Sequence, residues 1–318
     1  MAANPAEPPG PAGPVGYTLW AGTVGFTSPL AERFAAAAAT GCRQATLSPP
    51  DVLRAAADGV TAADVGRRAR DLGLDLVVDP VMNWYPDREP SPSRFAGVST
   101  DEALRMCEEL GVTSLSAIAT ASSDVPVPEL AGYFARLCDR AAGFGARVHL
   151  EFIPFTIVRT LGIAWDLVRA ADRANGGLVF DTWHFFRGEP QFDLLETIPG
   201  DRIFQVQLDD APAQPEGPLR QETSRRLLPG DGELDLVTAI RTLHRIGALR
   251  WVGPEVISPD LAALPVLAAA TLAMDRTRAS IAAALNGVLA SAPAGNIRPA
   301  DTPVAPAANR PRVPSGRS

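Results

Sequence analysis

The sequence predicts a single α/β domain with the architecture of a (β/α)8 barrel, also called a TIM barrel. Short apolar runs alternate with helical segments over some 270 residues, which suits this fold, since about 250 residues is typical of it. Within two of the runs, apolar and polar side chains alternate in the way expected of strands in a closed barrel. No GxGxxG follows the first run, which argues against an open, dinucleotide-binding sheet.

Eight runs are expected to be the strands, because each is short and mostly apolar. In chain order they are residues 17–22, 42–47, 74–79, 113–118, 147–152, 177–181, 202–208 and 249–256. Helical segments precede several of them and end at glycines that fit a left-handed C-cap: Gly41, Gly73, Gly111, Gly145, Gly176 and Gly247. The barrel is expected over residues 16–288. The ends, residues 1–15 and 289–318, are rich in Pro, Ala and Gly and are expected to be disordered tails.

The alternation of side chains decides between a closed barrel and an open sheet. In residues 147–152 and 204–209, apolar side chains occupy the even positions and polar ones the odd positions. An open α/β sheet is covered by helices on both faces and would be apolar on both. A barrel interior can turn polar near its catalytic mouth, so the pattern favours the barrel.

Composition limits the classes of function. With 29 basic and 36 acidic residues the net charge is −7, which argues against nucleic acid or an anionic membrane as the main partner. The chain has no Lys, which excludes Schiff-base aldolase chemistry. Its three Cys form no CxxC motif, and the N-terminus has no secretory signal. The longest apolar helix expected, residues 261–285, contains three charges and is not expected to span a membrane. A soluble cytoplasmic protein is expected.

Polar residues of the kind that bind a hard divalent cation end four of the expected strands, the fifth to the eighth. They are Glu151, Asp181, Gln207 and Glu255. A buried carboxylate at a strand end is costly unless something compensates its charge. Because the carboxyl ends of barrel strands meet at one mouth, the four are expected to converge there. All-oxygen ligation suits Mn²⁺ or Mg²⁺, whereas zinc more often recruits His or Cys. For each residue alone, a helix cap or an Arg ion pair is the alternative.

Other residues are candidates for the substrate pocket. Three carboxylates around one divalent ion leave the site with a net negative charge. A hydrogen-bond donor or a cation is therefore expected nearby, and His184 and Arg226 are the candidates. Three tryptophans fall at or just beyond strand ends and could wall a sugar-sized pocket, with core packing as the alternative: Trp20, Trp84 and Trp183. His149 shares the parity of Glu151 and is expected to be a buried, hydrogen-bonded histidine.

The order Glu, Asp-x-x-His, a polar residue on the seventh strand, an Arg before PGxG and a final Glu resembles the xylose-isomerase-like TIM barrels. That superfamily contains sugar (phosphate) isomerases and epimerases, inosose and 3-dehydroshikimate dehydratases, and an AP-endonuclease branch. The resemblance covers about residues 16–287. It implies metal ligation by Glu151, Asp181, Gln207 and Glu255, and substrate contacts by His184 and Arg226. Tagatose 3-epimerase-like members generally have His where this chain has Gln207, while some dehydroshikimate dehydratases have Gln.

Three functions are therefore open. The first is a metal-dependent isomerase or epimerase that acts on a ketose or related α-hydroxy-ketone through an enediolate, with Glu151 and Glu255 moving the proton. The second is a dehydratase of a cyclic ketol, with His184 or a Glu as general acid. The third is a non-catalytic barrel that binds a metabolite. A small sugar or cyclic polyol ketone is the expected partner, with no nucleic acid or membrane. The sequence leaves the oligomeric state open, a homo-oligomer included.

Overall fold

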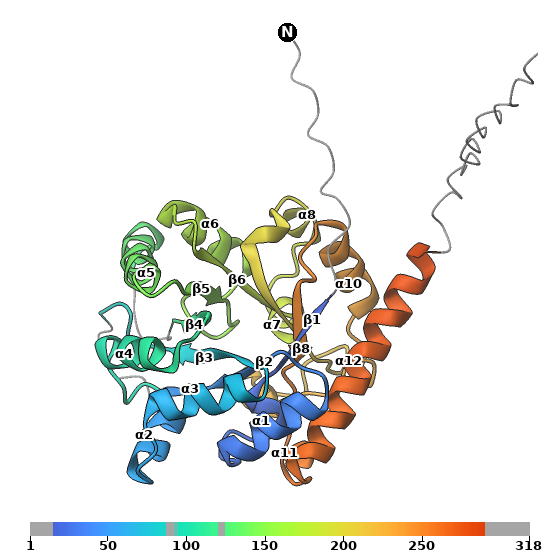
Figure 1. The fold of residues 1–318 in the computed structure, drawn as a ribbon. Helices are drawn as coiled ribbons and strands as arrows, with labels where there is room; N and C mark the ends of the chain where they lie inside the picture. Colours follow the sequence, from blue (N-terminus) through green and yellow to red (C-terminus); the bar gives the residue numbers. More distant parts are fainter. Residues whose placement is uncertain (1–14, 87–92, 94, 120–124, 290–318) are drawn as a thin grey trace, which may run out of the picture.

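A computed structural model of the chain describes residues 15–86, 93, 95–119 and 125–289. The described residues form one closed barrel of eight parallel strands, β1 to β8 in chain order, which confirms the predicted fold class (Figure 1). The strands are β1 Gly16–Leu19, β2 Gln44–Leu47, β3 Asp75–Val81, β4 Ser114–Ile118, β5 Arg147–Glu151, β6 Gly176–Asp181, β7 Ile203–Leu208 and β8 Trp251–Pro254. The predicted disordered tails lie outside the described residues, apart from Val15 and Leu289.

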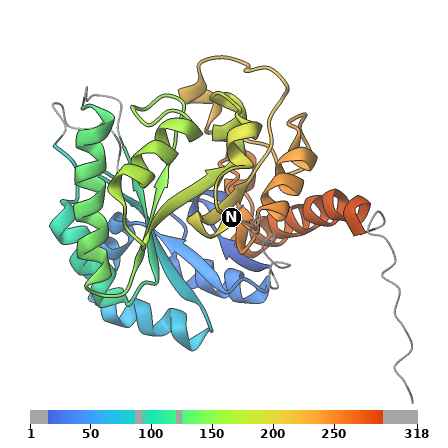
Figure 2. The same ribbon diagram turned by 90° about the horizontal axis from the view of Figure 1, so that it is seen from above.

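Helices connect the strands and surround the barrel (Figure 1). They are α1 Leu30–Ala39, α2 Pro49–Ala57, α3 Ala62–Asp71, α4 Thr100–Leu110, α5 Val127–Ala142, α6 Leu161–Ala171, α7 Thr182–Arg187, α8 Phe192–Leu195, α9 Leu219–Glu222, α10 Leu236–Arg245, α11 Pro259–Ala262 and α12 Val266–Leu289, with 3₁₀ turns at Ala21–Val24 and Gly200–Arg202. The long α12 packs beside α1 and α10 and projects at one side of the barrel (Figure 2). Within the described residues, no helix is long and apolar enough to cross a membrane.

The apolar core lies between the strands and the helices, and the barrel interior is polar. On β5, Val148 and Leu150 are fully buried in the core, whereas His149 and Glu151 alternate with them. On β7, Gln205 bonds across the interior to Thr18 of β1 and Gln44 of β2. The predicted alternation is therefore the alternation between the outside and the inside of the barrel.

Five of the six predicted left-handed glycines have positive φ: Gly41, Gly73, Gly111, Gly145 and Gly247. The prediction for Gly176 is wrong, because α6 ends at Ala171 with Asp172 as its left-handed C-cap (φ 47°), and Gly176 begins β6. Gly176 is needed for close packing instead, since a Cβ there would lie 3.2 Å from Cys138 Sγ and from the Phe134 ring.

Candidate active site

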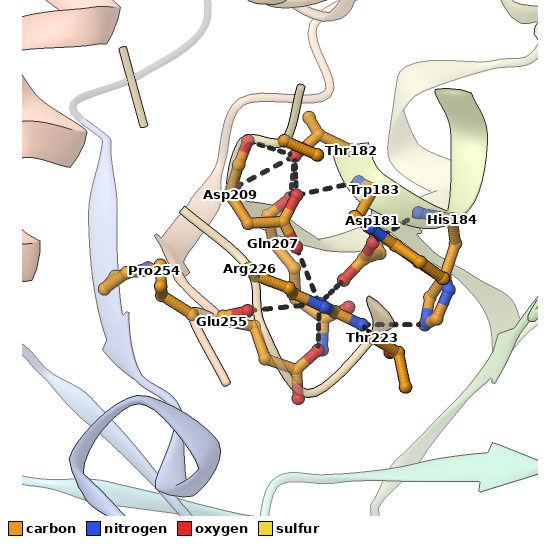
Figure 3. Close-up of polar contacts among 12 residues, drawn as sticks. Asp181, Thr182, Trp183, His184, Gln207, Asp209, Thr223, Arg226, Pro254 and Glu255 are labelled. Carbon is orange, nitrogen blue, oxygen red and sulfur yellow. Dashed lines mark hydrogen bonds and ion pairs between the residues drawn. The ribbon is translucent and has the colours of Figure 1, made fainter. Parts of the chain in front are cut away.

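The predicted quartet lies at the carboxyl end of the barrel. Glu151 is the last residue of β5, Asp181 is the last residue of β6, Gln207 is the penultimate residue of β7, and Glu255 directly follows β8. All four side chains are buried, the most exposed being Glu255 at 6%. Strand pairing sets Asp181 beside Gln207, and Gln207 beside Gly253. Asp181, Gln207 and Glu255 are drawn around one centre in Figure 3.

The Arg226 guanidinium occupies that centre (Figure 3). Its Nη1 donates to Asp181 Oδ2 at 2.7 Å, to Asp209 Oδ2 at 2.6 Å and to Glu255 Oε2 at 3.3 Å. Its Nη2 donates to Thr223 Oγ1 at 3.2 Å and lies 3.3 Å from His184 Nε2. Arg226, predicted from sequence to contact substrate, is thus also the buried counter-ion of three carboxylates.

Backbone pairing beyond β7 and β8 holds Arg226 in this place. Asp210 and Leu227 form an antiparallel bridge with N–H···O distances of 3.0 and 2.9 Å. The Arg226 amide donates to the Ile257 carbonyl at 3.0 Å, which ties the same segment to the chain after β8. The loop after β7 is therefore folded back over the mouth, and its arginine points inward.

Glu151, Asp181 and His184 could hold a metal ion together, since one ligand atom from each lies within 4.8 Å of the others. Asp181 caps α7, because its Oδ1 accepts from the His184 amide at 2.7 Å, so the helix starts at the strand end and brings the imidazole back over it. His184 Nε2 lies 3.2 Å from Glu151 Oε1. Asp181 therefore caps a helix, as the alternative interpretation expected, and also belongs to this cluster.

Buried polar atoms at this site lack partners. Among the described residues, neither amide atom of Gln207 has a hydrogen-bond partner, and neither does His184 Nδ1. Such groups are rare in native interiors because each forgoes its bonds to water. An oxygen donor without a partner, beside converging carboxylates, is what a divalent cation site offers before the ion is bound. The donor set therefore fits a divalent cation.

The site also carries more negative charge than Arg226 can balance. Burial raises the pKa of Glu151, Asp209 and Glu255 well above their ordinary values, and neighbouring carboxylates raise them further. Burial likewise raises the pKa of Asp79 to about 6. Asp181 is the exception, since Arg226 and His184 outweigh its burial and hold its pKa below the ordinary value. Clusters of shifted pKa values are typical of functional sites.

The profile of the family described as "Xylose isomerase-like TIM barrel" matches residues 34–280. The chain belongs to the xylose isomerase-like TIM barrel family.

Curated relatives within this family include a 3-dehydroshikimate dehydratase of Pseudomonas aeruginosa, 30% identical over 254 residues, which are 77% of this chain and 39% of that protein. An inosose isomerase of Bacillus licheniformis is 36% identical over 126 residues, which are 39% of this chain and 45% of that protein. The chain thus spans less than half the length of these two relatives.

Solved structures of xylose isomerase-like barrels share the fold. The IolI protein, solved with a bound zinc atom, superposes with a TM-score of 0.74 at 21% identity and covers 84% of this chain and 98% of that one. An L-ribulose 3-epimerase superposes with a TM-score of 0.67 at 17% identity and covers 88% of this chain and 99% of that one. At these identities the likeness shows the fold alone.

The predicted pocket walls, Trp20 and Trp183, are both fully buried. The Trp183 ring lies 5.3 Å from the guanidinium carbon of Arg226, and its Nε1 donates to Glu222 Oε1 at 3.1 Å. Trp183 therefore supports the residue at the centre of the site. The prediction of a hydrogen-bonded His149 is wrong: the ring is fully buried, but neither nitrogen has a partner among the described residues. Its neighbours on β4 and β6 are Ser116 and Gly177, and the Ser116 hydroxyl is committed to Asp79.

Two carboxylates of this site were not among the predicted ligands. Asp79 is buried on β3, at a register shift between Val78 and Val81, and accepts from Ser116 Oγ at 2.5 Å. Asp209 follows β7 and accepts from the Trp183 amide at 2.7 Å as well as from Thr182 and Arg226. The signal that could have found both is the one that found the quartet, a carboxylate at the end of an apolar run.

Proposed function

We propose that this xylose isomerase-like barrel is a divalent-metal-dependent enzyme that removes a proton next to the carbonyl group of a small polyhydroxylated ketone. The observation that carries the proposal is the convergence of Glu151, Asp181, Gln207 and Glu255, with Gln207 unpartnered and carboxylates in excess of the one guanidinium. The names of the relatives, a dehydratase and isomerases of cyclic or sugar-like compounds, agree with that substrate class.

The quartet would hold the cation through its carboxylate and carboxamide oxygens, which suits Mn²⁺ or Mg²⁺. The cation would supply Lewis acidity, which draws electron density from the substrate carbonyl and so acidifies the neighbouring C–H.

Side chains of the chain itself would move the proton. Glu151 or Glu255 would accept it, because both carboxyl groups are buried at the carboxyl end of the barrel, where the substrate carbonyl would meet the cation. His184, 3.2 Å from Glu151, would pass a proton to a departing or re-forming oxygen. Arg226 would stabilise negative charge on the substrate, since its Nη2 faces the imidazole of His184 rather than a carboxylate.

Dehydration is one ending that the comparisons support. A relative that aligns over 77% of this chain is a 3-dehydroshikimate dehydratase. Some dehydroshikimate dehydratases also resemble this chain in having Gln at the position of Gln207. In this ending the C–H proton goes to a Glu, the C–H electron pair forms a carbon–carbon double bond, and the β-hydroxyl leaves with a proton as water. The substrate would be a cyclic hydroxy-ketone of the 3-dehydroshikimate type.

Isomerisation or epimerisation, the first function expected from the sequence, is the other candidate. It is favoured by the inosose isomerase, 36% identical to this chain over 126 residues. It is also favoured by the placement of Glu151 and Glu255 on different strands, because one carboxylate could remove the proton and the other return it. Both endings share the first proton transfer.

Incubation with 3-dehydroshikimate or inosose in D₂O tests both endings, with Mn²⁺, Mg²⁺ or Zn²⁺ added separately. We expect deuterium to enter the C–H next to the carbonyl, and NMR of the product to show loss of water or a rearranged carbinol. Glu151→Gln and Glu255→Gln should include at least one variant that slows exchange by about 100-fold or more, the scale of general-base catalysis. Glu196→Gln, which removes an exposed carboxylate paired with Arg245, is the matched control. No exchange and no product with either compound, or undiminished exchange in both variants, contradicts the proposal.

A further inference from the structure

The barrel has a polar cavity at the end opposite the candidate active site, where the strands begin. This cavity, the amino-end pocket, has a volume of about 300 Å³ and is lined by residues of β2, β3, β4, β5, β7 and β8. The lining residues that matter are Gln44, Asp75, Ser114, Arg147, Phe204 and Trp251. Arg147 and Glu151 are four residues apart on β5, about 13 Å at 3.3 Å per residue. The amino-end pocket is therefore distinct from the candidate active site.

Two glycines make room for the aromatic walls of the amino-end pocket. A Cβ at Gly16 would lie 2.6 Å from the ring of Trp251, and a Cβ at Gly177 would lie 2.6 Å from the ring of Phe204. Any larger residue at either position would push the ring away. The rings therefore lie against bare backbone of β1 and β6, the two strands that contribute no side chain to this cavity.

Polar groups of the amino-end pocket lack partners among the described residues. Ser114 Oγ is buried, with the residue 5% exposed, and has no hydrogen-bond partner. Gln44 Oε1 accepts from Thr18 and Gln205, which leaves Gln44 Nε2 without an acceptor within the described residues. The pocket thus presents a buried hydroxyl without a partner and a carboxamide N–H that is free to donate to a ligand.

The two charged groups of the amino-end pocket are also unpaired within the described part of the chain. Arg147 forms no ion pair and lies with its guanidinium carbon 5.1 Å from the centre of the Phe204 ring. Asp75 forms no ion pair either, although both residues line the same cavity. They stand on β3 and β5, separated by β4, and Asp75 lies two residues before the level of Arg147, so their backbones are about 12 Å apart.

We propose that the amino-end pocket binds a small organic carboxylate that also carries a hydroxyl or ammonium group. The carboxylate would bind the Arg147 guanidinium and Gln44 Nε2, and the hydroxyl or ammonium group would donate to Asp75. Ser114 Oγ lies on the strand between them and would bond to either part. Carbon atoms of the ligand would contact the Phe204 and Trp251 rings. The volume is at the low end of the range for small-molecule sites, about 300 to 1,000 Å³, so the ligand has few carbons.

Glycerate and serine are the matched probes, because they differ in bearing a hydroxyl or an ammonium group beside the carboxylate. Calorimetric titration of the full chain with each, and with their shorter and longer homologues, should show saturable binding of at least one. Arg147→Gln and Ser114→Ala should each weaken that binding by about tenfold or more, the loss expected of one charge-assisted hydrogen bond. If serine is the better ligand, Asp75→Asn should weaken serine more than glycerate.

Two controls assign the binding to this cavity. Arg105→Gln removes an exposed arginine on α4 and should leave the affinity unchanged. Glu151→Gln alters the candidate active site and should leave it unchanged as well. Glycerol, which lacks the carboxylate, should not bind. The proposal is overturned if no carboxylate saturates the protein, since the pocket then holds only solvent. It is also overturned if binding is insensitive to Arg147→Gln and Ser114→Ala, or is lost in Glu151→Gln.

Discussion

Buried polar side chains line the barrel interior toward both ends, and they are neutral toward the amino end but mostly charged at the carboxyl end. Toward the amino end, Thr18, Gln44 and Gln205 form a neutral network across the barrel with distances of 2.8 to 3.2 Å. At the carboxyl end, buried carboxylates gather around Arg226, the pKa of most of them is raised, and polar atoms beside them lack partners.

Strand β7 supplies a glutamine to each end, so the comparison can be made with one residue type. Gln205 donates to Gln44 Oε1 at 2.8 Å and accepts from Thr18 at 3.2 Å. Gln207, two residues further on, is fully buried and has no partner for either amide atom among the described residues. Gln205 therefore contributes to stability through its bonds. Gln207 makes no such bond within the described residues, which is expected of a residue whose role is to bind a ligand.

The largest difference between the ends should follow from removal of the central guanidinium. Arg226→Met leaves buried carboxylates without their counter-ion, so the free energy of unfolding of the metal-free protein should fall by about 3–5 kcal/mol. Arg245→Met, which breaks the exposed pair with Glu196, should cost about 1 kcal/mol or less. Urea denaturation in the presence of a chelator measures both. If both variants lost the same small free energy of unfolding, the buried carboxylates at the carboxyl end would not need Arg226 as a counter-ion.

Asp79 should make the metal-free protein less stable as pH rises. Its folded pKa of about 6 is above the ordinary value of 3.8, so the folded carboxyl keeps its proton more firmly than the unfolded one. The stability it contributes is present below about pH 4 and is lost as pH rises through 6. Relative to Asp79→Asn, which cannot titrate, the wild type should lose up to about 3 kcal/mol between pH 4 and 7, at about 1.4 kcal/mol per pH unit. Denaturation at several pH values measures this, and a flat difference would contradict it.

The two glutamines of β7 give the most closely matched pair of variants. Gln205→Leu removes two hydrogen bonds, to Thr18 and Gln44, which keep only the bond between them, and it should lower the free energy of unfolding by about 1–3 kcal/mol. Gln207→Leu removes no hydrogen bond, so it should change stability by less than about 1 kcal/mol. Chemical denaturation in chelator compares them. The contrast between the ends fails if Gln207→Leu is the more destabilising of the two.

The fold could be predicted because its signals are local. The run 147–152 and the strand Arg147–Glu151 differ by one residue, since a period of two and a glycine at the preceding helix end are both visible in the sequence. Gly176 was misjudged because Asp172 took the left-handed position that glycine usually occupies. The quartet could be predicted for the same reason as the strands, since its members end apolar runs.

The rest of the site depends on contacts that the sequence does not encode locally. The central place of Arg226 is set by the bridge between Asp210 and Leu227 and by the bond to the Ile257 carbonyl. The approach of His184 to Glu151 requires α7 to begin directly after Asp181. Neither follows from residue type and spacing. The place of Arg226 depends on contacts between segments far apart in the chain, and the approach of His184 depends on a sharp change of chain direction after Asp181.

Titration of Mn²⁺ into the chelator-treated protein tests most directly whether the carboxyl end is a divalent metal centre. We expect the wild type and Gln205→Leu to bind a single ion with the same affinity. Asp181→Asn keeps an oxygen that can cap α7, so the variant should fold. Because it lacks the negative charge, it should bind Mn²⁺ more than about 100-fold more weakly. That loss exceeds the loss of affinity expected when a group that only orients a metal ligand is removed. Absence of saturable binding in the wild type, or equal affinity in Asp181→Asn, would contradict the account.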